Sequence, residues 1–418
     1  MPRRPHLVRA LATAAACAVA ASVAVASPTA ASGAGLPLSA TDQAVHDHLM
    51  TRALRPALGK DLAGIVTDQV TGQVMWAASS HEAQIPASNA KILTAVDALE
   101  VFGPDHRFTT SVWTGRTARR VVLYGGGDPS LSTGQLRRMA RAVAPGLLAA
   151  GIAKVTVDVD DTLFPAPTNA YGWKRSYTIE DVSPVRALVV DQHRRWDTSL
   201  DAGQVFARVL GKAGVAVRRV DHAVKPATAT VLAASEGATL QDIVTSMLQT
   251  SDNDIAEGLH RLVALQTGFP ATWTGAAQAR TAELTSLGVP LTTTMYDGSG
   301  LSRRDRLRPA ELVAVLAKIF DPAHPNLAGL QAGAFPIAGV SGTLAPDFRR
   351  YVTAPTSCAR GLIQAKTGSL TGVISLTGFA RGADGQVKLF SFLLNHVPST
   401  LTTRRAVDRL AATVTGCW

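Results

Sequence analysis

The sequence Ser88-Asn89-Ala90-Lys91 begins a segment whose apolar residues recur at helical spacing as far as Phe102. A separation of three residues places the Ser88 hydroxyl and the Lys91 amine on one face of that helix. The amine can accept the serine proton if burial or nearby charge lowers its pKa. The segment therefore predicts a nucleophile with its own base. For these four residues alone, a capping serine followed by a surface lysine is the plainer interpretation.

A second polar motif, Ser251-Asp252-Asn253, interrupts two apolar helical patterns. Such a break presents polar side chains at a cleft. A serine hydroxyl can relay a proton, and an asparagine amide both donates and accepts hydrogen bonds. Taken by itself, the same tripeptide is also an ordinary helix cap or turn.

The third motif, Lys366-Thr367-Gly368-Ser369, follows a predicted late strand. Gly368 leaves space close to the strand, so that a ligand can lie alongside it as an added strand. Lys366 and Thr367 are suited to hold a carboxylate, and the backbone N–H groups of Ser88 and Ser369 to form an oxyanion hole. The alternative is a simple turn at the strand end.

Together, in this order and in these helix, helix-break and strand contexts, the three motifs resemble those of the active-site serine penicillin-recognising enzymes. Further stretches resemble the penicillin-binding protein 4 type of D-alanyl-D-alanine carboxypeptidase/endopeptidase, a class C low-molecular-mass penicillin-binding protein. These stretches are residues 125–131 (GGGDPSL), 297–303 (DGSGLSR) and 339–344 (GVSGTL). The resemblance runs across almost the whole chain after its first segment.

This resemblance implies an α+β fold with several domains. The main domain would be β-lactamase/transpeptidase-like, with a five-stranded antiparallel sheet flanked by helices, and a second α+β domain would be inserted into it. Two early and three late predicted strands supply such a sheet if the two ends of the chain meet. Ser88 and Ser251 are 163 positions apart, and this interval is where the family carries its insertion.

The domain organisation follows from these patterns. We expect a signal peptide at residues 1–26, a flexible lead-in at 27–40, a peptidase domain formed by 41–106 and 231–418, and an inserted α+β domain at 107–230.

The resemblance also implies a mechanism. Ser88 would attack the carbonyl of the penultimate D-alanine of a peptidoglycan stem peptide, with neutral Lys91 as the base. Ser251 would pass a proton to the departing D-alanine, and β-lactams would acylate Ser88. Substrate binding would fall to Asn253, which orients the substrate amide, to Lys366 and Thr367, which bind the terminal carboxylate, and to Gly368 and Ser369. Carboxypeptidase and endopeptidase action both remain open.

Charge and leader point to export. The 418 residues include 41 Lys or Arg and 31 Asp or Glu, which gives a net charge of +10. At the start of the chain, Arg3, Arg4 and Arg9 precede an apolar run, and the sequence Ala24-Val25-Ala26 resembles a signal-peptidase cleavage site. After residue 26, the 38 basic and 31 acidic residues leave +7. The basic residues form no run of five, which argues against nucleic acid. We expect an exported protein, extracellular or loosely associated with the anionic cell envelope.

Cysteine usage agrees with export. Outside the leader only Cys358 and Cys417 remain, and they are expected to form one disulfide, with two free thiols as the alternative. The sequence His81-Glu82 has no histidine at position 85, so the metalloprotease helix motif is missing. No metal or other cofactor is expected.

Two rival functions fit parts of the sequence. A serine β-lactamase would share the three motifs, but it would have a shorter first interval. A non-catalytic cell-wall-binding scaffold would keep the fold without needing Ser88, Lys91, Ser251, Asn253 and Lys366 together.

Overall fold

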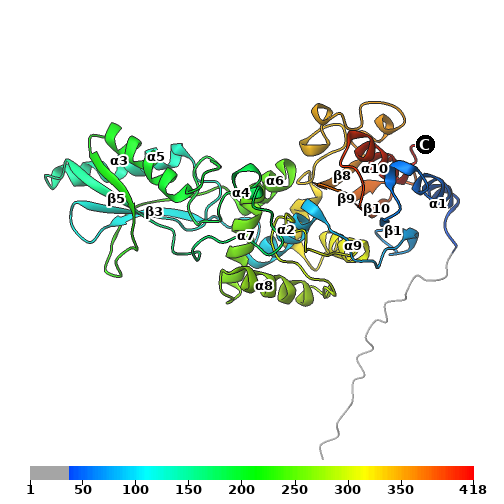
Figure 1. The fold of residues 1–418 in the computed structure, drawn as a ribbon, viewed down its shortest axis with the longest axis horizontal. Coiled ribbons are helices and arrows are strands. Elements are labelled where there is room, and N and C mark those ends of the chain that lie inside the picture. The colour runs from blue at the N-terminus through cyan, green and yellow to red at the C-terminus, as the bar shows by residue number, and fades with distance from the viewer. Residues whose placement is uncertain (1–36) are drawn as a thin grey trace, which may run out of the picture.

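The computed structural model describes residues 37–418, so the expected signal peptide and residues 27–36 of the lead-in lie outside the described residues. Two β-sheets lie at opposite ends of an elongated molecule, and a group of helices lies between them (Figure 1). No helix in residues 37–418 combines the length and the apolar character needed to span a bilayer.

The first sheet joins the two ends of the chain. Its strand order is β2-β1-β10-β9-β8, and every neighbouring pair is antiparallel. The strands are β1 (Leu62–Asp68), β2 (Val74–Ala78), β8 (Ile363–Leu370), β9 (Val373–Arg381) and β10 (Val387–Asn395). Leu62 lies opposite Leu394, so an early strand pairs with the last one. The predicted five-stranded antiparallel sheet is confirmed, and β8 is left at its edge.

Helices cover both faces of this sheet, so its central strands β1, β9 and β10 are buried over nearly their whole length. Helices α1 (Ala40–Ala53) and α10 (Leu401–Val414) pack against each other and against β2 and β9, while α9 (Pro309–Ile319) packs on β1 and β10. Cys417, just after α10, forms a disulfide with Cys358, with 6.1 Å between their Cα atoms. This is the pair expected from the sequence.

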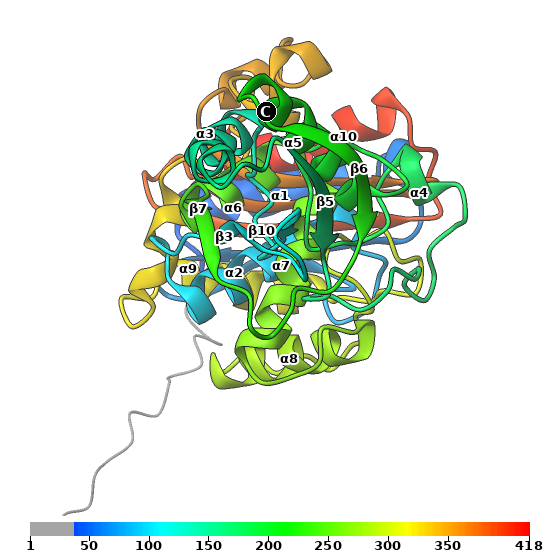
Figure 2. The same ribbon diagram turned by 90° about the vertical axis from the view of Figure 1, so that its left-hand side faces the viewer.

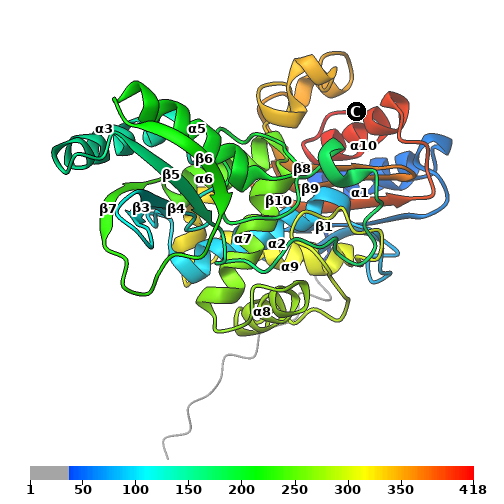
Figure 3. The same ribbon diagram turned by 60° about the vertical axis from the view of Figure 1, so that its left-hand side comes forward.

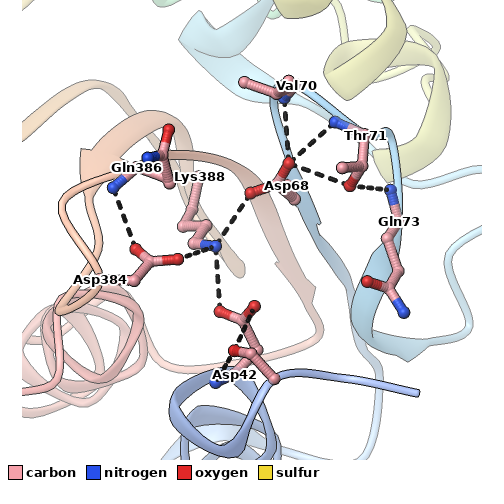
Figure 4. Close-up of polar contacts among 9 residues, drawn as sticks. Asp42, Asp68, Val70, Thr71, Gln73, Asp384, Gln386 and Lys388 are labelled. Carbon is pink, nitrogen blue, oxygen red and sulfur yellow. Dashed lines mark hydrogen bonds and ion pairs between the residues drawn. The ribbon is translucent and has the colours of Figure 1, made fainter. Parts of the chain in front are cut away.

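A buried lysine ties the first helix to the middle of the sheet. Lys388 of β10 is 1% exposed, and its ammonium contacts three carboxylates from three different segments (Figure 4). The Nζ–oxygen distances are 2.9 Å to Asp42 of α1, 2.9 Å to Asp68 at the end of β1 and 2.7 Å to Asp384. Because a buried charge is costly without partners, this cluster fixes how the N-terminal helix, the sheet and the 382–385 turn meet.

Replacing Lys388 with methionine is expected to destabilise the protein by roughly 3–5 kcal/mol, because three carboxylates would lose their shared cation inside the fold. Urea unfolding would measure the change. Lys318→Met is the control, since the ammonium of Lys318 is 3.8 Å from Asp321 at the surface and a surface pair contributes about 0–1 kcal/mol. Equal unfolding midpoints for the two variants would contradict the expectation.

The second sheet is mixed and has the order β6-β5-β4-β3-β7. Its strands are β3 (Thr109–Thr114), β4 (Arg120–Tyr124), β5 (Lys154–Asp160), β6 (Ala216–His222) and β7 (Val231–Glu236). Helices α3 (Thr133–Ala149) and α5 (Thr198–Lys212) lie side by side and pack on it (Figure 2). The short α4 (Tyr177–Glu180) lies nearer the first sheet than these two helices do (Figure 1). Since β7 pairs with β3, the sheet reaches beyond residue 230. We therefore propose that the inserted domain extends to Glu236.

The helices between the sheets surround α2 (Ala90–Phe102), which is buried along most of its length (Figure 3). Its neighbours are α6 (Leu240–Thr250), α7 (Asn253–Gln266), α8 (Trp273–Ser286) and α9. Because α2 is buried on all sides, its polar side chains Lys91, Thr94 and Asp97 have their partners inside the protein. This packing holds the start of α2, and with it Ser88, between the edge strand β8 and the junction of α6 and α7.

Candidate active site

Ser88 lies in a tight turn just before α2. A 3-10 turn spans Ala87–Asn89, and Ala87 is fully buried with φ +48°, a backbone region in which residues other than glycine are strained. The Asn89 amide donates to the backbone oxygen of Lys366 at 2.7 Å, and its oxygen accepts from the Thr377 hydroxyl at 2.9 Å. These bonds fix the turn that carries Ser88 against strands β8 and β9.

Lys91 is completely buried, and its amine has three neighbours. Its Nζ lies 3.2 Å from the Ser88 Oγ, 2.6 Å from Oδ1 of Asn253 and 2.8 Å from the backbone oxygen of Ser299. A neutral amine has two N–H donors and one lone pair. Asn253 and Ser299 supply acceptors for the two donors, which leaves the lone pair for the Ser88 hydroxyl. The contacts therefore suit a base.

The protonation of Lys91 reflects two opposed effects. Burial lowers the pKa of Lys91 to about 8. Four nearby carboxylates oppose this effect and raise the pKa: Glu257, Asp297, Asp252 and Asp254. An amine with a pKa near 8 is neutral in part of the population at neutral pH, as a general base must be.

The second motif forms the junction of α6 and α7. Ser251 ends α6 in the left-handed conformation, with φ +60°, and Asp252 caps α7 by accepting from the Ile255 N–H at 2.8 Å. Asn253 then begins α7, and its Nδ2 donates to the Asp181 backbone oxygen at 2.9 Å. Each polar end of Asn253 therefore has one protein partner and keeps a further donor or acceptor, and its contact with the substrate amide stays a prediction.

The third motif lies on the edge strand β8. Gly368 packs against the turn that carries Ser88: a Cβ there would lie 2.1 Å from the Ser375 hydroxyl and 3.0 Å from the Pro86 oxygen. Ser375 itself donates to that oxygen at 2.7 Å. A side chain at position 368 would thus collide with the protein, and glycine lets the turn that carries Ser88 pack directly against β8. Residues 336–338 bridge the outer edge of β8 as far as Ala365, whose N–H donates to the Pro336 oxygen at 3.0 Å. Beyond Ala365, none of the described strands pairs with that edge.

A cavity of about 200 Å³ joins the motifs. It is lined by Ser88, Ser251, Thr343, Phe348, Arg350, Thr367, Gly368, Ser369, Ile374, Ser375 and Arg404. Thr367 donates to the Thr343 hydroxyl at 2.7 Å, and Nη2 of Arg404 lies 3.3 Å from the Ser369 hydroxyl. Ser88, Ser251 and β8 therefore share one cavity, as the resemblance implied.

Lys366 is placed differently from the other residues of its motif. It is completely buried, it is not among the residues lining the cavity, and its Nζ donates to the Thr367 backbone oxygen at 2.9 Å. Burial, followed by the charge of Lys91, lowers the pKa of Lys366 well below its usual value. Arg404 of α10 is instead a cation at the cavity wall, and no motif in the sequence had indicated it.

The segment from Asp297 to Arg303 is a loop that contacts Lys91 through the Ser299 backbone oxygen. Asp297 accepts from the Gly300 N–H at 2.7 Å and from the Trp173 indole at 2.7 Å, which holds the loop closed. Gly300 has φ +81°, and a Cβ there would lie 1.9 Å from the Ala87 oxygen. Only glycine lets the loop approach the nucleophile turn this closely.

Glu257 binds this loop through hydrogen bonds, and no motif in the sequence had indicated it. It is fully buried and accepts from the N–H groups of Gly298 at 3.0 Å and Ser299 at 2.8 Å. Burial, followed by the charge of Asp297, raises the pKa of Glu257 to about 7. Glu257 thus holds the residue whose carbonyl contacts Lys91. A glutamate four residues after Asn253, on one face of an apolar helix, was the available signal.

Replacing Glu257 with glutamine is expected to slow acylation by a β-lactam roughly tenfold to a hundredfold, because the amide cannot accept both loop N–H groups and Ser299 shifts. The loss of a negative charge near Lys91 should also move the pH midpoint of acylation lower. The pH profile of the acylation rate measures both effects.

Glu311→Gln is the matched control for that experiment. Glu311 is also buried and also holds a loop, accepting from the N–H groups of Thr292 and Arg308, but it does not contact the Lys91 network. An unchanged rate and midpoint in Glu257→Gln, or equal changes in both variants, would rule out the positioning role.

The folded chain and its cavity define a serine acyl-transfer enzyme with the penicillin-recognising architecture. A family model described as the D-Ala-D-Ala carboxypeptidase 3 (S13) family matches residues 45–195 and 192–414. The chain belongs to this family and is a serine-type carboxypeptidase, a hydrolase.

Individual relatives agree with this assignment. A carboxypeptidase of Mycobacterium tuberculosis is 35% identical over 388 residues, which cover 87% of this chain and 82% of the relative. The crystal structure of penicillin-binding protein 4 from Haemophilus influenzae matches with a TM-score of 0.74 at 22% identity, covering 89% of this chain and 98% of that one. A structure of the same Haemophilus protein complexed with a β-lactam matches at 0.68 and 24% identity, with the same coverage. The predicted fold is confirmed by this likeness.

Proposed function

We propose that this protein is an exported D-Ala-D-Ala carboxypeptidase that cleaves peptidoglycan stem peptides through an acyl-enzyme on Ser88 and is acylated by β-lactams. The arrangement of the Lys91 amine carries the proposal, because two acceptors take its N–H groups and the Ser88 hydroxyl lies 3.2 Å away. The family assignment and the β-lactam complex of the Haemophilus protein support the substrate and inhibitor classes.

In the acylation step, the Ser88 oxygen attacks the carbonyl carbon of the penultimate D-alanine, and neutral Lys91 takes the hydroxyl proton. The C–N bond then breaks, and the proton passes from Lys91 through Ser251 to the departing amine. The N–H groups of Ser88 and Ser369 stabilise the oxyanion, at roughly 3–4 kcal/mol of barrier per donor. Water later hydrolyses the ester and restores the serine.

Substrate binding uses the walls of the cavity. Thr367 and Ser369 present hydroxyls there, and Arg404 adds the cationic group that a terminal carboxylate requires. Lys366 is buried in β8 with its Nζ on the Thr367 backbone oxygen, and it contributes positive potential when it is protonated. Asn253 positions Lys91 in the free enzyme. The edge of β8 beyond Ala365 accepts the extended stem peptide as an added strand.

A serine β-lactamase is the rival activity, and turnover separates the two. The purified protein should react with a chromogenic cephalosporin about once per molecule and then stop, because the acyl-enzyme is released slowly. A stopped-flow trace would show a stoichiometric burst with little steady-state rate. Rapid continuous hydrolysis would support a β-lactamase and contradict the proposal.

The same proposal places the protein outside the cytoplasm, in the medium or at the envelope. The leader-like sequence of residues 1–26 and the net charge of +7 on the remaining chain support this location. Washing intact cells with salt should release the protein if it is held by charge alone.

A further inference from the structure

The positive charge of the described chain belongs to the inserted domain. Residues 107–236 contain 18 Lys or Arg and 11 Asp or Glu, a net charge of +7, whereas the other described residues contain 20 of each. Ser88, Lys91 and Ser251 all lie outside this domain. The excess positive charge therefore lies in a different domain from the catalytic motifs.

Most arginines in the centre of the inserted domain are neutralised. Their carboxylate partners lie on nearby strands, loops and helices, and one of them, Asp254, belongs to α7 of the peptidase domain. The pairs are Arg120 with Asp158 and Asp221, Arg186 with Asp161 and Asp197, Arg194 with Asp254, Arg195 with Asp201, and Arg219 with Asp221. These pairs use up acidic side chains and leave the excess of positive charge elsewhere.

The excess includes the outer helices α3 and α5, which lie side by side at the end of the molecule farthest from the first sheet (Figures 1 and 2). Helix α3 has three arginines and no acidic residue. The exposed cations of the two helices are Arg137, Arg138, Arg141, Arg208 and Lys212. Within residues 37–418, none of them has a carboxylate within 4.0 Å.

Three of these cations surround one hollow. Arg137, Arg141 and Lys212, together with Val209 and Ala213, line a cavity of about 170 Å³ between α3 and α5, which we call the basic groove. Arg137 and Arg141 are four residues apart, and like charges at that spacing destabilise a helix. A face that serves only solubility usually mixes both signs of charge. The basic groove therefore has the character of a binding site for anions.

We propose that the basic groove binds a linear, flexible polyanion of the cell envelope whose phosphate groups recur along the chain. The placement of this polyanion in the cell envelope rests on the proposed function, whereas the binding of phosphate by the basic groove does not. Arginine guanidinium groups donate paired hydrogen bonds to phosphate, and the further cations on α3 and α5 extend the charged surface past one phosphate. The groove has no aromatic lining on which nucleobases could stack.

The test uses the mature chain, residues 27–418, and inorganic polyphosphate as the probe. The variant Arg137→Gln/Arg141→Gln/Lys212→Gln should weaken binding at low salt by at least about tenfold. It should also reduce the slope of log K against log salt by about 2, because roughly 0.7 is lost per phosphate contact. The control, Arg55→Gln/Lys60→Gln/Arg381→Gln, removes the same charge from exposed positions of the peptidase domain and should bind like the wild type.

Several results would overturn the proposal. Equal losses in both variants would show that only net charge matters, and unchanged binding in the groove variant would exclude the groove. Tighter binding of free inorganic phosphate, duplex DNA or anionic lipid vesicles than of polyphosphate would assign a different ligand. Thermal melting checks that both variants fold. Stem-pentapeptide cleavage is measured separately from polyphosphate binding. A failure of the proposed activity then leaves the groove result intact, and a failure of polyphosphate binding leaves the activity result intact.

Discussion

Replacing Ser88 with alanine is expected to abolish covalent labelling of the protein by labelled benzylpenicillin and to remove peptidase activity. Acylation needs an oxygen nucleophile at this position, and the described structure places the Lys91 amine 3.2 Å from the Ser88 hydroxyl. Loss of a nucleophile typically costs several orders of magnitude in rate. Gel fluorescence and intact-protein mass spectrometry would detect any residual adduct.

Ser357→Ala is the control for this experiment. Ser357 is exposed, beside Cys358, and it does not line the active-site cavity. Its variant should be labelled as fully as the wild type. A Ser88→Ala protein that folds normally and still takes up the label would move the nucleophile to another residue.

Replacing Lys91 with alanine is expected to reduce the acylation rate by about 10²- to 10⁴-fold, the usual contribution of a general base. The cavity left by the lysine adds a structural effect, so Lys91→Met, which keeps most of the volume, is the more informative companion. Stopped-flow acylation by benzylpenicillin measures the rate. Lys60→Ala, at an exposed position, is the control.

The wild-type pH profile provides a second measure of the same role. Only the neutral amine can take the serine proton, and burial lowers the pKa of Lys91 to about 8. The acylation rate should therefore rise about tenfold per pH unit well below pH 8 and level off above it. Lys91→Met should lose this dependence. A profile that falls as pH rises through 8, or full activity of Lys91→Met, would show that another group is the base.

Much of the fold was predictable because its signals are local. The strand and turn patterns around Gly382 and Gly385, and the apolar spacing after Ser88, each depend on neighbouring residues. The five-stranded sheet then required only that the first strands meet the last ones. The sequence prediction ended the inserted domain at residue 230 and so left β7 in the peptidase domain, because the pairing of β7 with β3 spans more than 100 positions.

The candidate site was predictable for residues in motifs, and less so for those that act across the fold. Glu257 and Arg404 occur in no motif, and their roles depend on which loop or strand lies opposite them. Gly368 was predictable from the strand as a position of close approach, but its packing against Ser375 and the turn at Pro86 was not. Tertiary contacts of this kind leave no periodic trace in the sequence.

Cleavage of a synthetic stem pentapeptide ending in D-Ala-D-Ala is the most direct test of the central claim. Mass spectrometry after incubation with the wild-type protein should show a product lighter by one alanine residue. The same peptide with Ser88→Ala, and a peptide ending in D-Ala-L-Ala with the wild type, should stay intact. An intact D-Ala-D-Ala peptide with the wild type, or equal cleavage by Ser88→Ala, would contradict a serine D-Ala-D-Ala carboxypeptidase acting through Ser88.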